Sequence, residues 1–123
     1  MPPRPPRDPT ALLPLTPAMF HVLLSLAGGD RHGYAIIKEV AERTGGEVEL
    51  STGTLYGLVK RLLADGLIVT AKRRPASASD DERRHYYSLT DFGRRVASAE
   101  AERHERIVQT ARARRLLRRT GDA

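Results

Sequence analysis

Hydrophobic residues recur with helical spacing along the first half of the chain. Thr16 and Pro17 signal a helix start, because Thr is a good N-cap and Pro suits the first helical position. An apolar run follows and ends at Gly28-Gly29. The apolar residues cover a broad face of the helix, which predicts that the helix is buried. They are Met19, Phe20, Val22, Leu23 and Leu26.

A second amphipathic helix is predicted between Asp30 and Gly45-Gly46. Charged residues occupy one side of this segment. The other side carries apolar residues with helical spacing, namely Tyr34, Ile37, Val40 and Ala41. Residues 47–50 are short and alternating, which predicts a minimal strand.

The clearest helical pattern follows Ser51, a good N-cap, and stops at Gly66, the glycine expected just after a helix end. Apolar residues recur at i, i+3, i+4, i+7 and i+8 within it. We expect all five of these residues to point into the protein: Leu55, Leu58, Val59, Leu62 and Leu63.

Beyond Gly66 the pattern changes to the period of two that is typical of strands. Residues 67–72 alternate between apolar and polar, and residues 84–89 carry a second strand pattern. The polar residues 75–83 separate the two stretches. Strand, polar loop and strand predict a β-hairpin.

Thr90 then caps a long final helix that we expect to run to about Arg119. The sequence therefore predicts a mainly α fold with a small β-hairpin, a winged helix-turn-helix with a long C-terminal dimerisation helix. A four-helix bundle with an inserted hairpin is the alternative. We divide the chain into a flexible Pro/Arg-rich arm (1–15), a winged helix-turn-helix DNA-binding domain (16–90), a C-terminal dimerisation helix (91–119) and a tail (120–123).

Composition and charge exclude several classes of function. The 123 residues contain no cysteine, which rules out disulfides, thiol catalysis and cysteine-ligated zinc. The four histidines are isolated and no phosphate-binding loop or nucleophile elbow occurs, so we expect no enzyme, no metal and no cofactor. No apolar run approaches the roughly 18 residues that cross a bilayer, and we expect a cytoplasmic protein. The net charge of +6 favours a polyanion, either nucleic acid or an anionic membrane surface; the winged-helix pattern favours double-stranded DNA and no membrane.

With its leucines inward, the third predicted helix turns polar residues outward in its N-terminal half. A recognition helix enters the major groove by this half, and its N-terminus suits a phosphate. A basic wing would contact DNA beside it. We expect DNA contacts from Ser51, Thr52, Thr54, Tyr56, Lys60, Arg73, Arg74 and Arg84. A solvated helix face, and a charged sheet edge that only prevents aggregation, are the alternatives.

Three motifs resemble those of the PadR family of bacterial transcriptional regulators. Residues 51–68 carry Gly-Thr-Leu-Tyr, Lys-Arg-Leu and Gly-Leu-Ile, as the family's recognition segment does. Residues 32–36, His-Gly-Tyr-Ala-Ile, resemble the start of its second helix, and residues 84–93 resemble its second wing strand and last helix start. The resemblance implies that Tyr56 and Lys60 contact DNA.

The resemblance also implies that Tyr34 reaches a backbone phosphate from the start of the second helix. Because Tyr34 lies on the apolar face of that helix, we expect a mixed role, with part of the ring in the core. The family commonly has Pro after its Leu-Tyr pair, where this chain has Gly57. Glycine loosens a helix interior by roughly 1 kcal/mol relative to alanine, which leaves the path of that turn open.

A homodimer would present two recognition helices to an inverted-repeat operator. The final helix carries a heptad-like seam, too weak for a free coiled coil, that suits packing on the first helix of a partner. We expect dimer contacts from Met19, Phe20, Leu23, Ala101, His104, Val108 and Ala111. The predicted function is that of a dimeric repressor, and a small-molecule effector that releases the DNA is a further candidate partner, as the resemblance implies. A MarR-like regulator and a winged-helix interaction module that binds no DNA are the alternatives.

Overall fold

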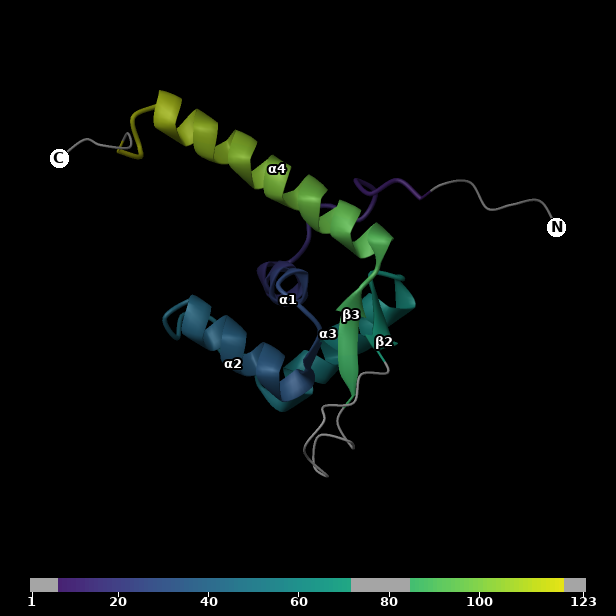
Figure 1. Cartoon of the computed structure of the whole chain (residues 1–123). Coiled ribbons are helices and arrows are strands. Elements are labelled where there is room, and N and C mark those ends of the chain that lie inside the picture. Colours follow the sequence, from purple (N-terminus) through teal and green to yellow (C-terminus); the bar gives the residue numbers. More distant parts are fainter. Residues whose placement is uncertain (1–6, 72–84, 119–123) are drawn as a thin grey trace.

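A computed structural model of the chain describes residues 7–71 and 85–118. The elements follow one another as α1 (Pro17–Ala27), β1 (Arg31–His32), α2 (Gly33–Arg43), α3 (Thr52–Ala64), β2 (Ile68–Ala71), β3 (Tyr86–Leu89) and α4 (Asp91–Ala113). α4 crosses one end of the molecule, and α1 lies between it and the pair formed by α2 and α3 (Figure 1). This is the mainly helical winged helix-turn-helix that the sequence predicted. The predicted tail, 120–123, lies outside the described residues.

Side-chain N-caps begin the helices, as the sequence predicted for three of them. Thr16, Ser51 and Thr90 each accept a hydrogen bond from the backbone N–H three residues further on. Each bond satisfies one of the donors that the first turn of a helix leaves free. α2 differs from its prediction, because it begins at Gly33 rather than near Asp30, and the side chain of its preceding residue caps it.

The sheet contains a strand that the sequence pattern did not reveal. The strand order is β1-β3-β2, both pairings are antiparallel, and Arg31 of β1 lies opposite Tyr87 of β3. The strand predicted at 47–50 is wrong, because these residues form bends in which the Val48 N–H donates to the Thr44 hydroxyl at 3.0 Å. A strand of two residues, such as β1, is too short to show an alternating pattern.

α3 packs on the core through a narrower face than the sequence predicted. Leu55, Val59 and Leu62 are at most 3% exposed. Leu58 is only partly buried and Leu63 keeps 37% of its surface exposed, so the prediction that both point inward is corrected. On a helix the i, i+4 and i+7 positions share one line, whereas i+3 and i+8 lie on its two flanks.

The turn between β3 and α4 rests on the backbone that follows α3. The Thr90 hydroxyl donates to the carbonyl oxygen of Gly66 at 2.7 Å and accepts the N–H of Gly93 at 2.9 Å. A Cβ atom on Gly93 would overlap the backbone carbonyl of Leu67, so only glycine fits there. These contacts fix the start of α4 relative to α3 and the hairpin.

Residues 7–15 pack on the domain, although the sequence predicted an unpacked arm there. Leu15 is 7% exposed and belongs to the hydrophobic core, and Leu12 and Leu13 pack against it. The backbone N–H of Leu15 donates to Oε2 of Glu100 in α4 at 2.7 Å. The prediction is therefore corrected for this segment, while residues 1–6 lie outside the described part of the chain.

α4 is shorter than the sequence predicted, because it ends at Ala113 rather than near Arg119. Arg115 adopts a left-handed conformation with φ 63°, and the N–H of Leu116 donates back to the carbonyl oxygen of Ala111 at 2.9 Å. This is a Schellman motif, which usually carries glycine at the left-handed position. Because the chain has arginine there, no stop signal is visible in its sequence.

Candidate nucleic-acid interface

Residues 51–60, the N-cap of α3 and its first nine residues, form an exposed polar surface. Ser51, Thr52, Thr54 and Lys60 are exposed, and Tyr56 keeps 49% of its surface accessible. The Ser51 hydroxyl accepts the N–H of Thr54 at 3.1 Å and donates to the Thr54 hydroxyl oxygen at 2.9 Å. The predicted outward orientation of these side chains is therefore confirmed.

Tyr56 packs against a glycine at the start of α2. A Cβ atom on Gly33 would lie 2.9 Å from the Tyr56 hydroxyl oxygen and 3.2 Å from the ring carbon that bears it. The Tyr56 side chain thus takes up the space that any side chain at position 33 would need. Burial raises the pKa of Tyr87 in β3, and the nearby Tyr56 raises it further. Tyr87 therefore stays protonated beside this contact at neutral pH.

Tyr34 lies in the first turn of α2 and keeps 63% of its surface exposed. The prediction that part of its ring lies in the core is therefore wrong. Tyr34 directly follows Gly33, against which Tyr56 packs, so the two tyrosines belong to one surface. The N-terminal ends of α2 and α3 meet there (Figure 1). We call this the α2–α3 surface, and it consists of Tyr34, Ser51, Thr52, Thr54, Tyr56 and Lys60.

The charge distribution around the α2–α3 surface favours an anion. Neither α2 nor α3 has an acidic residue in its first turn, so no carboxylate of that turn offsets the positive end of either helix dipole. Residues 51–64 contain no acidic residue and contribute Lys60 and Arg61. Backbone N–H groups at a helix N-terminus, together with basic side chains, bind phosphate oxygens well.

The sheet connects the start of α2 to the hairpin. β1 immediately precedes α2 and pairs with β3, and the ring of His32 packs edge-on against that of Tyr86 with centroids 5.4 Å apart. β2 pairs with β3 on the other side. The hairpin is therefore held beside α2 by its strands, but the predicted wing contacts lie outside the described residues; these are Arg73, Arg74 and Arg84.

Two residues predicted at a dimer interface are buried inside this chain. Met19 is 7% exposed and Leu23 is fully buried, so neither offers a surface to a partner and the prediction is corrected for both. α1 is covered by α2 and α4 of the same chain, which its apolar breadth alone could not indicate. Phe20 is partly buried, and its ring centroid lies 5.1 Å from that of His104 in α4.

The C-terminal half of α4, from Ala101 onward, keeps accessible apolar residues. Ala101 and His104 are exposed, whereas Val108 and Ala111 are partly buried. Ile107 keeps 55% of its surface accessible although no part of its side chain is polar. These residues of the predicted dimer seam remain available to a partner. The buried part of α4 is the N-terminal continuation of this same helical face, namely Gly93, Val96, Ala97 and Glu100.

Glu100 is a buried charge that the sequence did not predict. Its side chain is fully buried. Oε1 accepts a hydrogen bond from Nε of Arg103 at 2.5 Å, and Oε2 accepts one from the backbone N–H of Leu15 at 2.7 Å. Nε2 of His104 lies 3.9 Å from Oε2. Burial by itself raises the pKa of Glu100, but the bonds from Arg103 and Leu15 outweigh it and hold the pKa below its ordinary value. The ionised carboxylate thus joins residues 7–15 to α4. In the sequence it cannot be told from a solvated helix glutamate.

Within residues 7–71 and 85–118, no group of three or more His, Asp or Glu side chains could hold a metal ion. None of the helices in these ranges is long and apolar enough to span a membrane. A hollow of about 320 Å³ lies between the N-terminal segment and the C-terminal end of α3. It shares no residue with the α2–α3 surface.

The sequence profile of the transcriptional regulator PadR-like family matches residues 22–99, which include the whole α2–α3 surface. Uncharacterized protein X of Lysinibacillus sphaericus is 32% identical over 69 residues, which make up 56% of this chain and 61% of that protein. The matched part of the chain thus spans less than two thirds of that relative's length.

Solved structures share the fold. A PadR family transcription regulator from hypervirulent Clostridium difficile is 28% identical with a TM-score of 0.66, and the match covers 77% of this chain and 94% of that one. Bordetella bronchiseptica BpsR is 26% identical with a TM-score of 0.58 over 78% of this chain and 64% of that one. The DNA binding of BpsR is regulated by 6-hydroxynicotinic acid.

Proposed function

The chain belongs to the PadR-like family of transcriptional regulators, and we propose that it is a dimeric repressor that binds an inverted-repeat operator through the α2–α3 surface. Membership makes it a DNA-binding regulator rather than an enzyme. The proposal rests on one observation: Tyr34 and Tyr56 are exposed near two helix N-termini whose first turns contain no acidic residue, and Lys60 is exposed further along α3. We place its action in the cytoplasm, where its operator would be.

In this proposal α3 enters the major groove by its N-terminal half. Base edges and nearby phosphates are faced by the hydroxyls of Thr52 and Thr54 and by the ammonium of Lys60. Hydroxyl and ammonium groups donate hydrogen bonds to the acceptor atoms of bases and to phosphate oxygens. Tyr34 faces the sugar-phosphate backbone from α2. Tyr56 is supported by the glycine beneath it, so its side chain loses little freedom on binding. The wing adds phosphate contacts from Arg73, Arg74 and Arg84, a part of the proposal that rests on the sequence.

The dimer would place two copies of α3 about one helical turn of DNA apart, roughly 34 Å. The accessible apolar residues on the C-terminal part of this α4 face support this part of the proposal, because an apolar helix face in water is stabilised by a partner. Phe20 and His104 lie together at the edge of the same side and complete the candidate interface. The interface thus comprises Phe20, Ala101, His104, Ile107, Val108 and Ala111.

A small-molecule effector is the remaining part of the proposal. It is supported by BpsR, whose DNA binding responds to 6-hydroxynicotinic acid and whose sequence is 26% identical. We extend this kind of regulation to the present chain, so that binding of an effector lowers its affinity for the operator.

The decisive experiment is selection of bound DNA from a random pool, with the parent protein and with Tyr56→Ala and Lys60→Ala. Lys38→Ala is the matched control, because Lys38 is also exposed but lies on α2 outside the α2–α3 surface. We expect the parent and Lys38→Ala to enrich the same inverted repeat and the other two variants to lose it. Enrichment of no sequence by the parent, or of the same repeat by Lys60→Ala, would overturn the proposal.

A further inference from the structure

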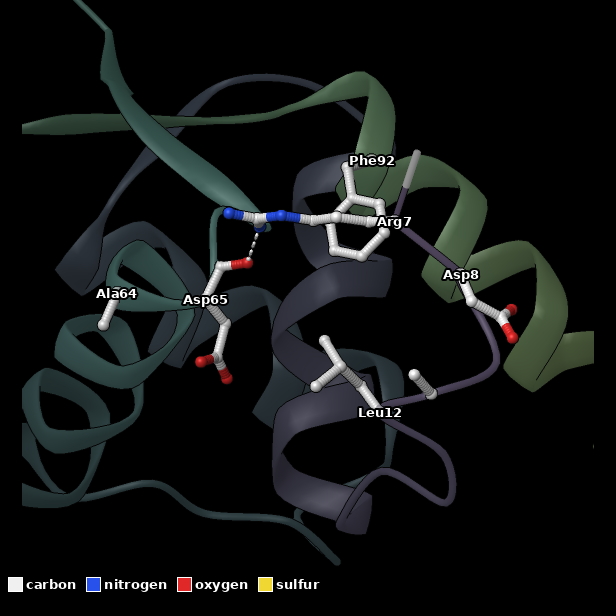
Figure 2. Close-up of a pocket in the computed structure, with 7 residues that line it drawn as sticks. Arg7, Asp8, Leu12, Ala64, Asp65 and Phe92 are labelled. Carbon is white, nitrogen blue, oxygen red and sulfur yellow. Dashed lines mark hydrogen bonds between the residues drawn. The ribbon is translucent and has the colours of Figure 1, made fainter. Parts of the chain in front are cut away.

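The hollow beside the C-terminal end of α3 is a mixed aromatic and polar pocket of about 320 Å³. Figure 2 shows Arg7 reaching across it from the N-terminal segment, toward the backbone of Asp65 and beside the ring of Phe92. A second hollow of about 100 Å³ adjoins it, because Leu12 and Asp65 line both. The volume of the larger hollow is at the lower end of the range for small-molecule sites, roughly 300–1,000 Å³.

The guanidinium of Arg7 shows what the pocket can hold. Its Nη1 donates to the carbonyl oxygen of Asp65 at 2.6 Å, and its central carbon lies 5.2 Å from the centroid of the Phe92 ring. A cation at that distance from an aromatic face is attracted to it. A Cβ atom on Gly66 would lie 2.5 Å from Nη1, so the absence of a side chain there makes room for the cation.

The electrostatic surroundings also favour a cation. Asp65 is the C-cap of α3, where the helix dipole presents its negative end. Its carboxylate is 34% exposed, and within residues 7–71 and 85–118 its one ion pair is a loose one with Arg61 at 4.0 Å. A second arginine, Arg95, lies 5.9 Å from the centroid of Phe92, so the ring already attracts two guanidinium groups.

The other carboxylate of the pocket, that of Asp8, takes no part in attracting the cation. Oδ1 of Asp8 accepts both the N–H and the hydroxyl of Thr10, at 2.9 and 2.7 Å. In Figure 2 the Asp8 carboxylate points away from Arg7. The features that select a cation are therefore the Phe92 ring and the carbonyl and carboxylate of Asp65.

We propose that this pocket binds a small planar organic cation, an aromatic amidine or guanidine, in the position that the Arg7 guanidinium occupies. Arg7 is an exposed residue, so a ligand with the same charge and shape can displace it at little cost. The ligand would donate to the Asp65 carbonyl, pair with the Asp65 carboxylate and stack on Phe92, while its apolar part lies against Leu12.

The pocket lies where the recognition helix meets the dimerisation helix. Asp65 ends α3, and Phe92 lies in the first turn of α4, next to the Thr90 hydroxyl that holds Gly66. A ligand that bridges Asp65 and Phe92 therefore acts on the joint that positions α3. Its effect on DNA affinity rests on the proposed function, whereas its binding does not.

The test is isothermal titration of the full chain with benzamidine, with neutral benzamide and anionic benzoate as matched probes. We expect saturable binding of benzamidine, at least tenfold weaker binding of benzamide and none of benzoate. Arg7→Ala should bind benzamidine several-fold more tightly, because it removes the competing guanidinium. Asp65→Asn and Phe92→Leu should each weaken binding about tenfold. Arg106→Ala removes an exposed arginine elsewhere on α4 and should change nothing.

Arg7→Ala decides the outcome, because Arg7 is exposed and its removal leaves the core intact. Failure of benzamidine to bind this variant would overturn the proposal, as would binding of benzoate that Arg7→Ala abolishes. Thermal melting of each variant separates loss of binding from loss of fold. Benzamidine binding without any DNA binding would support the proposed pocket and refute the proposed function. DNA binding without any benzamidine binding would support the proposed function and refute the proposed pocket.

Discussion

The Tyr56 hydroxyl oxygen lies 2.9 Å from where a Cβ atom on Gly33 would stand. These two residues join the exposed side of α3 to the first turn of α2, across 23 positions of sequence. The contact sets how closely the two helix N-termini approach, and with it the spacing of the groups that would meet DNA. Gly33 is therefore a positioning residue for the α2–α3 surface.

We expect Gly33→Ala to weaken operator binding at least fivefold, because the added methyl group must displace Tyr56. Overpacking of this kind costs about 1–3 kcal/mol of folding free energy, and we expect a value near the lower end because an exposed ring can move. Operator titration and denaturant unfolding measure the two effects.

Gly57→Ala is the stability control for that variant. Apart from the neighbouring backbone of α3, no atom of the described residues lies within 4 Å of a Cβ atom at position 57, so alanine meets no obstacle there. We expect it to stabilise the protein by up to about 1 kcal/mol, because alanine favours a helix interior over glycine by that amount. Equal destabilisation by both substitutions would contradict the role assigned to Gly33.

Gly93→Ala should be far more damaging. Its methyl group would overlap the backbone carbonyl of Leu67, which cannot move without shifting β2. We expect a loss of more than about 3 kcal/mol of folding free energy, at the upper end for a single substitution. Ser98→Ala, at an exposed position of α4, should stay within about 0.5 kcal/mol of the parent. A Gly93→Ala protein that melts like the parent would refute the close approach.

Glu100 should make stability depend on pH in the acid range. Its pKa lies below its ordinary value of 4.5 in the folded protein, so the stabilisation is complete above about pH 4.5 and is lost as the pH falls through the folded pKa. Glu100→Gln removes the charge that accepts the bonds from Arg103 and Leu15. Because Arg103 remains partly exposed, we expect a loss of about 1.5 kcal/mol at pH 7, the lower end for a hydrogen bond to a charged group. The difference in unfolding free energy between the parent and Glu100→Gln, measured by denaturant unfolding, should narrow toward pH 3. A gap that is constant with pH would contradict an ionised Glu100.

Lys60→Ala should alter the salt dependence of operator binding as well as its strength. The logarithm of the binding constant falls with the logarithm of salt concentration by about 0.9 for each phosphate neutralised, so loss of one contact should reduce the slope by that amount. Lys38→Ala should leave the slope unchanged. Fluorescence anisotropy of a labelled operator at four salt concentrations measures it, and a parent protein with no salt dependence would exclude this mode of binding.

Ile107→Asp should convert the proposed dimer to a monomer. Ile107 is 55% exposed in the single chain, so the substitution leaves the fold of the chain intact but places a charge in the proposed interface. Light scattering after gel filtration measures the mass, and the melting curve serves as the control for folding. An unchanged dimer would place the interface elsewhere.

The local pattern of the sequence was enough to predict most of the fold. Caps at Thr16, Ser51 and Thr90 act within three residues, so the sequence alone located the starts of α1, α3 and α4. The same holds for the outward side chains of α3, because the period of a helix decides which positions share a face. Helical spacing alone therefore identifies Tyr56 and Lys60 as outward-facing residues.

Tertiary contacts decided the rest. Sequence spacing could not show that Leu23 is covered by the chain's own helices or that Leu15 belongs to the core, because burial depends on which elements meet. It could not distinguish Glu100 from a solvated glutamate, since its partner Leu15 lies 85 positions away.

The order of the four helices and the hairpin, the caps of α1, α3 and α4 and the exposed chemistry of α3 thus follow from the sequence by itself, because each depends on residues within one or two helical turns. The placement of Tyr56 on Gly33, the packing of residues 7–15 and the pocket at Phe92 were decided only by the tertiary structure. The physical reason is that a contact between distant segments depends on the shape of both surfaces, and no spacing within either segment encodes it.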